Sequence, residues 1–164
     1  MATAIAGKFD HDPHECVHDL RNDPHSGYRA VHIWLKQPAR VEIQIRTHLQ
    51  GRWANMYEAA ADVLGREIRY GALPTGASDK RQVENLHALS HEIKELEDLS
   101  NEAFLLALAI EDIPQENRAR TLESGRIRLQ RLRKDLKNRE SRVINDCDAL
   151  RIDFEQHRGP GGEL

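Results

Sequence analysis

Five side chains in the first third of the chain have the chemical types needed to bind and react with a nucleotide. They are Tyr28, His32, Glu42, Gln44 and Arg46. An aromatic ring can stack on a nucleobase, and Gln and Arg side chains can hold phosphate oxygens. A carboxylate can bind Mg²⁺ or accept a proton from an attacking hydroxyl group. All five have even numbers, so the two-residue period of a β-strand would direct them to one face of a sheet.

Two alternating segments are expected to position these side chains. Residues 28–35 and 40–46 alternate polar and apolar residues, and the short connection between them predicts an antiparallel hairpin. A register that keeps the polar side chains together puts His32 opposite Glu42 or Gln44, and Tyr28 or Ala30 opposite Arg46. The alternation alone also fits an ordinary sheet whose polar face is only solvated.

The other face of the hairpin carries apolar side chains, which are Val31, Ile33, Val41, Ile43 and Ile45. We expect a helix to bury them. That helix should begin at Thr47, a suitable N-cap, and end at Gly65. Its buried stripe is predicted from residues at helical spacing, which are Leu49, Trp53, Met56, Ala60 and Leu64.

The composition narrows the class of protein. The chain has 164 residues, with 24 Lys and Arg against 27 Asp and Glu, so its formal charge is −3. This balance argues against binding nucleic acid or anionic membranes through bulk positive charge. The sequence has no apolar run of membrane-spanning length and no secretory signal pattern. Its two cysteines make no disulfide framework, so we expect a cytoplasmic location.

The sequence divides into four segments. Residues 1–26 are expected to be irregular, and residues 27–78 to form the α+β part, ending in a breaker-rich linker at 71–78. Residues 79–158 are predicted to form an antiparallel helical hairpin that turns at Ile113 and Pro114, and residues 159–164 to be disordered. Heptad spacing in this tail, at Leu122, Leu129, Leu136, Val143 and Leu150, predicts helix packing.

Three short motifs resemble the RelA/SpoT alarmone synthetase family. That family has the pattern G-Y-[RQ]-S-x-H, a turn, V-E-I-Q-I-R-T, and then a helix bearing W-A. Here residues 26–32 read Ser-Gly-Tyr-Arg-Ala-Val-His, residues 41–47 read Val-Glu-Ile-Gln-Ile-Arg-Thr, and Trp53-Ala54 follows. The resemblance covers about residues 19–58. It implies a mixed, nucleotidyltransferase-like sheet flanked by helices, and transfer of pyrophosphate from ATP to the 3′-hydroxyl of GDP or GTP with Mg²⁺.

The resemblance also implies a role for each matching residue. Tyr28 would stack on guanine, and Glu42 would be the catalytic carboxylate and the metal ligand. Gln44, Arg46, His32 and Arg29 would line the nucleotide site. Gly27 would allow the backbone turn before the strand. Tails of small synthetases of this type support oligomer contacts, so a homo-oligomer or a partner synthetase subunit is expected.

The sequence departs from the family pattern at several points. The family's donor-binding basic residues and metal-binding Asp lie well upstream of the tyrosine motif, whereas 27 residues precede Tyr28 here. His25 replaces a Lys, Ala30 replaces a Ser, and Tyr57-Glu58 replaces Glu-His. We therefore expect the C-terminal half of a synthetase domain, weakly active or inactive alone. The alternatives are a catalytically dead module that binds guanine nucleotide or pairs with a subunit, and a toxin-like tRNA pyrophosphotransferase.

Two further clusters carry polar side chains. His11, His14, Cys16 and His18 have metal-ligand types, but their spacing matches no familiar site, and we expect a polar segment instead. A basic stretch in the second tail helix comprises Arg126, Arg128, Arg131, Arg133, Lys134 and Lys137. We expect it to be a solvated, ion-paired surface whose partners are Glu92, Glu95, Glu97 and Asp98 of the preceding helix, with contact to RNA or ribosomes as the alternative.

Overall fold

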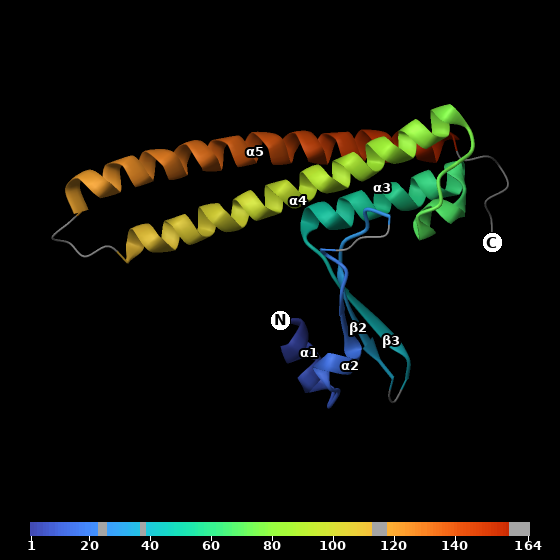
Figure 1. Ribbon diagram of the computed structural model, residues 1–164, viewed down its shortest axis with the longest axis horizontal. Helices are drawn as coiled ribbons and strands as arrows, with labels where there is room; N and C mark the ends of the chain where they lie inside the picture. The colour runs from blue at the N-terminus through green and yellow to red at the C-terminus, as the bar shows by residue number, and fades with distance from the viewer. Residues whose placement is uncertain (23–25, 37–38, 113–117, 158–164) are drawn as a thin grey trace.

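The protein has two parts, a layer of three helices and a small antiparallel sheet that projects from it (Figure 1). The computed structural model describes residues 1–22, 26–36, 39–112 and 118–157. The elements in chain order are α1 (Ala2–Lys8), α2 (Pro13–Cys16), β1 (Val17–Asp19), β2 (Val31–Leu35), β3 (Val41–Ile45), α3 (His48–Leu64), the 3₁₀-helix η1 (Arg66–Tyr70), α4 (Ala77–Glu111) and α5 (Arg118–His157). The expected α+β class is confirmed.

The sheet has the order β1-β2-β3, and both pairs of strands are antiparallel. The predicted hairpin is formed by β2 and β3, and its register pairs His32 with Gln44 and Trp34 with Glu42. The even-numbered side chains therefore share one face, as the alternation predicted.

The expectation that residues 1–26 are irregular is wrong for most of that segment. Asp12 caps α2 by accepting a hydrogen bond from the backbone N–H of His14 at 2.9 Å, with Pro13 at the first helical position. β1 then pairs with β2. β1 was not predicted because three residues are too few for alternation to be visible, and its pairing with β2 supplies its stability.

The apolar face of the sheet is covered by α1 and α2, not by the helix after β3. Ala6 and Cys16 pack with Ile33 and Leu35, all of them buried. The expected cover by residues 47–65 is therefore wrong, and so is the burial of Val41, which is 48% exposed. The apolar stripe of α3 is used instead against α4 and α5, which would otherwise expose their own stripes to water.

The predicted limits of α3 are correct. The Thr47 hydroxyl accepts a hydrogen bond from the Gln50 backbone N–H, and the Gln50 side chain accepts one from the Thr47 N–H, forming a capping box. Gly65 follows the last turn. Of the predicted stripe, Leu49, Trp53, Met56 and Ala60 are buried and Leu64 is partly buried.

The tail is an antiparallel pair of long helices, as predicted (Figure 1). Leu86, Ile93 and Leu96 of α4 share a core with Val143 and Phe154 of α5. Leu129 is buried, and Leu136 and Leu150 are partly buried. The predicted turn at residues 113–114, the Leu122 side chain and the end at 159–164 lie outside what the structure describes.

The basic stretch of α5 is exposed to solvent as expected, but in the described part of the chain it forms none of the predicted ion pairs with acidic residues of α4. Among the described residues, Arg128 is the only one of its six cations with an ion pair, to Glu102 at 3.2 Å. Two of the expected acidic partners are engaged elsewhere: Glu97 accepts from Gln50 at 2.6 Å, and Asp98 pairs with Lys94. The charges of the other five cations face solvent. No helix in the described part of the chain is both long enough and apolar enough to cross a membrane.

Candidate functional site

The polar face of the hairpin brings the predicted nucleotide-binding side chains into one hydrogen-bonded row. The Tyr28 hydroxyl donates to Oε1 of Gln44 at 3.2 Å, and the Arg46 guanidinium donates to the same oxygen. Nε2 of His32 lies 3.1 Å from the Tyr28 hydroxyl, and Nδ1 of His32 contacts Oε1 of Glu42. Residues from the segment before β2, from β2, from β3 and from the position directly after β3 thus converge on one surface.

Both ring nitrogens of His32 face oxygen atoms. The Tyr28 hydroxyl hydrogen is directed to Gln44, so the Tyr28 oxygen is available to accept from Nε2 of His32. Because a carboxylate only accepts, Nδ1 of His32 is the donor to Glu42, while Nε2 faces the Tyr28 hydroxyl. His32 therefore links an aromatic ring to a carboxylate.

The electrostatics of the row keep Tyr28 neutral. Burial raises the pKa of the Tyr28 phenol above its ordinary value, with the Arg46 guanidinium acting in the opposite direction. The Cζ atom of Arg46 lies 5.3 Å from the centroid of the Tyr28 ring, within the range of a cation–π contact. Tyr28 consequently stays a hydrogen-bond donor near neutral pH, and its ring also makes an edge-to-face contact with the ring of His32.

Trp34 is part of this face, although sequence analysis assigned it no role. Its indole Nε1 donates to Oε1 of Glu42 at 3.3 Å, and its ring lies 4.0 Å from the ring of His18 on β1. The even number of Trp34 already indicated the correct face. His18 could not be placed from the sequence, because its neighbourhood depends on the pairing of β1 with β2.

Two other predicted residues have different surroundings. Gly27 has φ of +78°, in the left-handed region that favours glycine, and its carbonyl accepts from the Ser90 hydroxyl. The expected backbone turn is present. Arg29, in contrast, is buried away from the row: its guanidinium donates to the Arg21 carbonyl and lines a separate cavity beside Lys94 and Glu97.

The carboxylate of Glu42 does not by itself make a Mg²⁺ site. Mg²⁺ takes six oxygen ligands, commonly one or two carboxylates with water and phosphate. Glu42 instead has the nitrogens of His32 and Trp34 against Oε1. Within residues 1–22, 26–36, 39–112 and 118–157, no group of three or more His, Cys, Asp or Glu side chains is arranged to hold a metal ion. This includes the His-rich segment, where His11 instead accepts from the Lys36 N–H at 3.1 Å.

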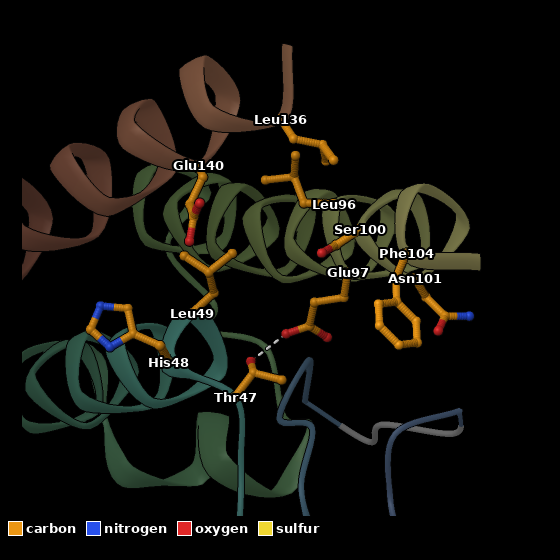
Figure 2. A pocket seen from close by; sticks show the side chains of 10 residues that line it. All are labelled: Thr47, His48, Leu49, Leu96, Glu97, Ser100, Asn101, Phe104, Leu136 and Glu140. Atoms are coloured by element: carbon orange, nitrogen blue, oxygen red, sulfur yellow. Dashed lines mark hydrogen bonds between the residues drawn. The ribbon is translucent and has the colours of Figure 1, made fainter. Parts of the chain in front are cut away.

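A larger cavity, of about 550 Å³, lies where the first turn of α3 meets α4 and α5 (Figure 2). Leu49, Leu96, Phe104 and Leu136 supply much of its wall, and Thr47 donates to Glu97 at its edge. None of the residues predicted to bind nucleotide lines this cavity. The candidate site is therefore the polar sheet face.

Part of the chain is similar to three mycobacterial proteins. They are the uncharacterized proteins Rv1366 and MT1412 of Mycobacterium tuberculosis and Mb1401 of Mycobacterium bovis, each 59% identical over 75 residues. The match covers 45% of this chain and 27% of each relative, so the matched region is about a quarter of their length. No family model matches the chain, and no solved structure matches it.

Proposed function

We propose that this chain carries the acceptor-nucleotide face of a RelA/SpoT-like guanosine pyrophosphotransferase domain. The observation that supports this is the row formed by Tyr28, His32, Glu42 and Gln44, completed by Arg46. An aromatic platform, a cation and a carboxylate on one rigid surface match what a nucleoside diphosphate offers: a base, phosphates and a ribose hydroxyl.

In this proposal the acceptor lies along the hairpin. Guanine stacks on the Tyr28 ring, and the phosphates contact Arg46 and the Gln44 amide. The 3′-hydroxyl points toward Glu42, which accepts its proton while the hydroxyl oxygen takes the pyrophosphate of ATP and AMP departs. His32 positions the carboxylate, since its Nδ1 already contacts Oε1 of Glu42.

Binding without catalysis is the second candidate function. It is favoured by the contacts of Glu42, which are to the nitrogen atoms of His32 and Trp34, and by the finding that the described residues include no group of three or more His, Cys, Asp or Glu side chains arranged to hold a metal. In this case the chain binds guanine nucleotide or pairs with a subunit that supplies the donor site. Guanine-nucleotide binding is required by the first candidate and by the nucleotide-binding form of the second, so it is the property to test first.

Calorimetry with GDP in the presence of a chelator tests the proposal. Tyr28→Ala should weaken GDP binding about tenfold, because stacking contributes roughly 1–3 kcal/mol per base. Tyr70→Ala is the matched control, since Tyr70 is 86% exposed on η1, outside the row. Equal GDP affinity in the parent and in Tyr28→Ala, with both folded by circular dichroism, would overturn the proposed site.

A second pair of variants separates phosphate contacts from general charge. Arg46→Ala should weaken GDP binding, with a loss that shrinks as salt increases. Arg126→Ala removes an exposed cation of α5 that forms no ion pair with the described residues, and it should leave GDP binding unchanged. Equal losses in the two variants would indicate attraction by net charge alone.

A further inference from the structure

A second aromatic surface lies at the far end of the same sheet face. A cavity of about 370 Å³ is lined there by Trp34, Leu35, Lys36, Arg40, Val41 and Glu42. It is close to the turn of the hairpin, whereas Tyr28 precedes β2 at the opposite end of that strand. Glu42 is shared, since it contacts both Trp34 and His32.

Trp34 is held as a platform and still offers surface to a ligand. His18 lies against the ring at 4.0 Å between centroids, with the planes 38° apart. Glu42 fixes the indole N–H at 3.3 Å. The side chain nevertheless remains 47% exposed, while Trp53 in the core is 2% exposed. The contacts with His18 and Glu42 already restrict the rotation of the Trp34 side chain. A base that stacks on the ring therefore causes little further loss of side-chain entropy.

Two cations line the cavity beside this platform. Lys36 and Arg40 are exposed, and neither forms an ion pair with the residues that the structure describes. The Lys36 backbone N–H donates to Nε2 of His11 at 3.1 Å, which ties the end of β2 to the segment between α1 and α2. An aromatic ring next to unpaired cations is the arrangement that recognises a base together with phosphate.

We propose that the hairpin end is a second nucleotide subsite, in which a base stacks on Trp34 and the phosphates contact Lys36 and Arg40. The inference extends the proposed function, because Glu42 then lies between two nucleotides. Stacking at Trp34 requires none of Tyr28, Gln44 or Arg46, so either subsite can fail without the other. The ligand class is a nucleoside di- or triphosphate, with little preference among bases because every base has a stacking face.

Tryptophan fluorescence of the full chain tests the subsite directly. The chain has two tryptophans, and only Trp34 is exposed to ligand. ATP should quench the emission saturably in the parent and equally in Tyr28→Ala. Inorganic triphosphate should compete with ATP without quenching, because it has no base. Adenosine should quench only at far higher concentration, because it has no phosphate.

Variants assign the contacts. The double variant Lys36→Ala/Arg40→Ala should weaken ATP binding by about tenfold and reduce its dependence on salt. Trp34→Ala, followed by calorimetry, should cause a similar loss, and Phe104→Ala should cause none, since Phe104 is an exposed apolar residue on α4. If Trp34→Ala does not fold, the ATP affinity of Lys36→Ala/Arg40→Ala, which changes only exposed side chains, decides the result.

Three results would overturn the inference. They are the absence of quenching at millimolar ATP in folded parent protein, unchanged ATP affinity in the double variant, and loss of quenching in Tyr28→Ala. The last result would mean that one nucleotide spans the whole face. Persistent ATP quenching with unchanged GDP affinity in Tyr28→Ala would instead reject the acceptor site and retain this subsite.

Discussion

The backbone of Gly27 lies directly against the indole ring of Trp53. A Cβ atom added at Gly27 would lie 3.0 Å from Cζ2 of Trp53 and 3.2 Å from the Cβ of Ser90. The indole N–H of Trp53 donates to the Leu86 carbonyl at 2.8 Å, so the ring cannot easily move aside. The glycine and the tryptophan of the recognised motifs thus meet where the sheet joins the helical layer.

Gly27→Ala should therefore destabilise the protein by about 1–3 kcal/mol, through strain at positive φ and overlap with Trp53. Gly51→Ala is the matched control. Gly51 lies inside α3 with nothing within 4 Å of an added Cβ, so alanine should stabilise by roughly 0.5–1 kcal/mol. Urea denaturation measures both, and shifts of the same sign would contradict this account of the joint.

Glu42→Gln should leave GDP binding unchanged or slightly tighter when metal is chelated. The substitution removes a negative charge that repels the phosphates, and an amide oxygen can still face His32. Calorimetry on Glu42→Gln beside the parent measures the effect. If Glu42→Gln abolishes metal-free GDP binding, the carboxylate is a primary binding group and the proposed orientation of the acceptor is wrong.

The chain alone should produce little or no guanosine tetraphosphate from ATP and GDP with Mg²⁺. Glu42 is a single carboxylate whose Oε1 already contacts nitrogen atoms of His32 and Trp34, and a single carboxylate is not enough to hold the Mg²⁺ that binds the ATP triphosphate. Nucleotide chromatography of the reaction mixture is the measurement. Robust product formation would show that the described residues are sufficient for the donor as well as for the acceptor.

His87 should make stability depend on pH. Burial lowers its pKa below the ordinary 6.5, with the Glu84 charge acting weakly the other way. The folded state then binds fewer protons than the unfolded state, so its full stability is present above about pH 6.5 and decreases as the pH falls through the folded pKa. His87→Gln removes this titration and keeps an N–H to face the Tyr57 hydroxyl, 3.0 Å away.

Denaturation at about pH 7.5 and about pH 5 measures that dependence. The loss of unfolding free energy on acidification should be smaller in His87→Gln than in the parent. His91→Gln, on the exposed side of the same helix, should behave like the parent. If His87→Gln loses as much unfolding free energy on acidification as the parent does, other groups cause the acid sensitivity.

Local sequence patterns predicted the elements whose signals are contained in a few residues. The alternation within residues 28–35 and 40–46 predicted β2 and β3, which the structure limits to Val31–Leu35 and Val41–Ile45, and the face that holds the candidate site. Thr47 and Gly65 predicted the two ends of α3, because capping residues interact with backbone groups within the neighbouring helical turn. Which surface each element covers was not predictable in this way. The stripe of α3 is equally compatible with the sheet and with α4 and α5.

The errors in the candidate site have the same origin. Arg29 follows Tyr28 in sequence and precedes β2, yet its guanidinium donates to the carbonyl of Arg21, in another segment and away from the row. Trp34 became relevant only when β1 brought His18 against its ring. Pairings across distant segments depend on the free energy of the whole fold, which no short motif encodes.

Within the residues that the structure describes, two hydrophobic clusters have no residue in common. One holds α3, α4 and α5 together, and the other joins the sheet to α1 and α2. Such a division predicts two cooperative units with separate opening equilibria, and the unit with the smaller core should open more often. Amide hydrogens of β2 and β3 should then exchange faster than those in the middle of α4. A nucleotide bound on the sheet face would slow exchange most in the sheet unit, because binding to the folded state alone stabilises the unit that holds the site.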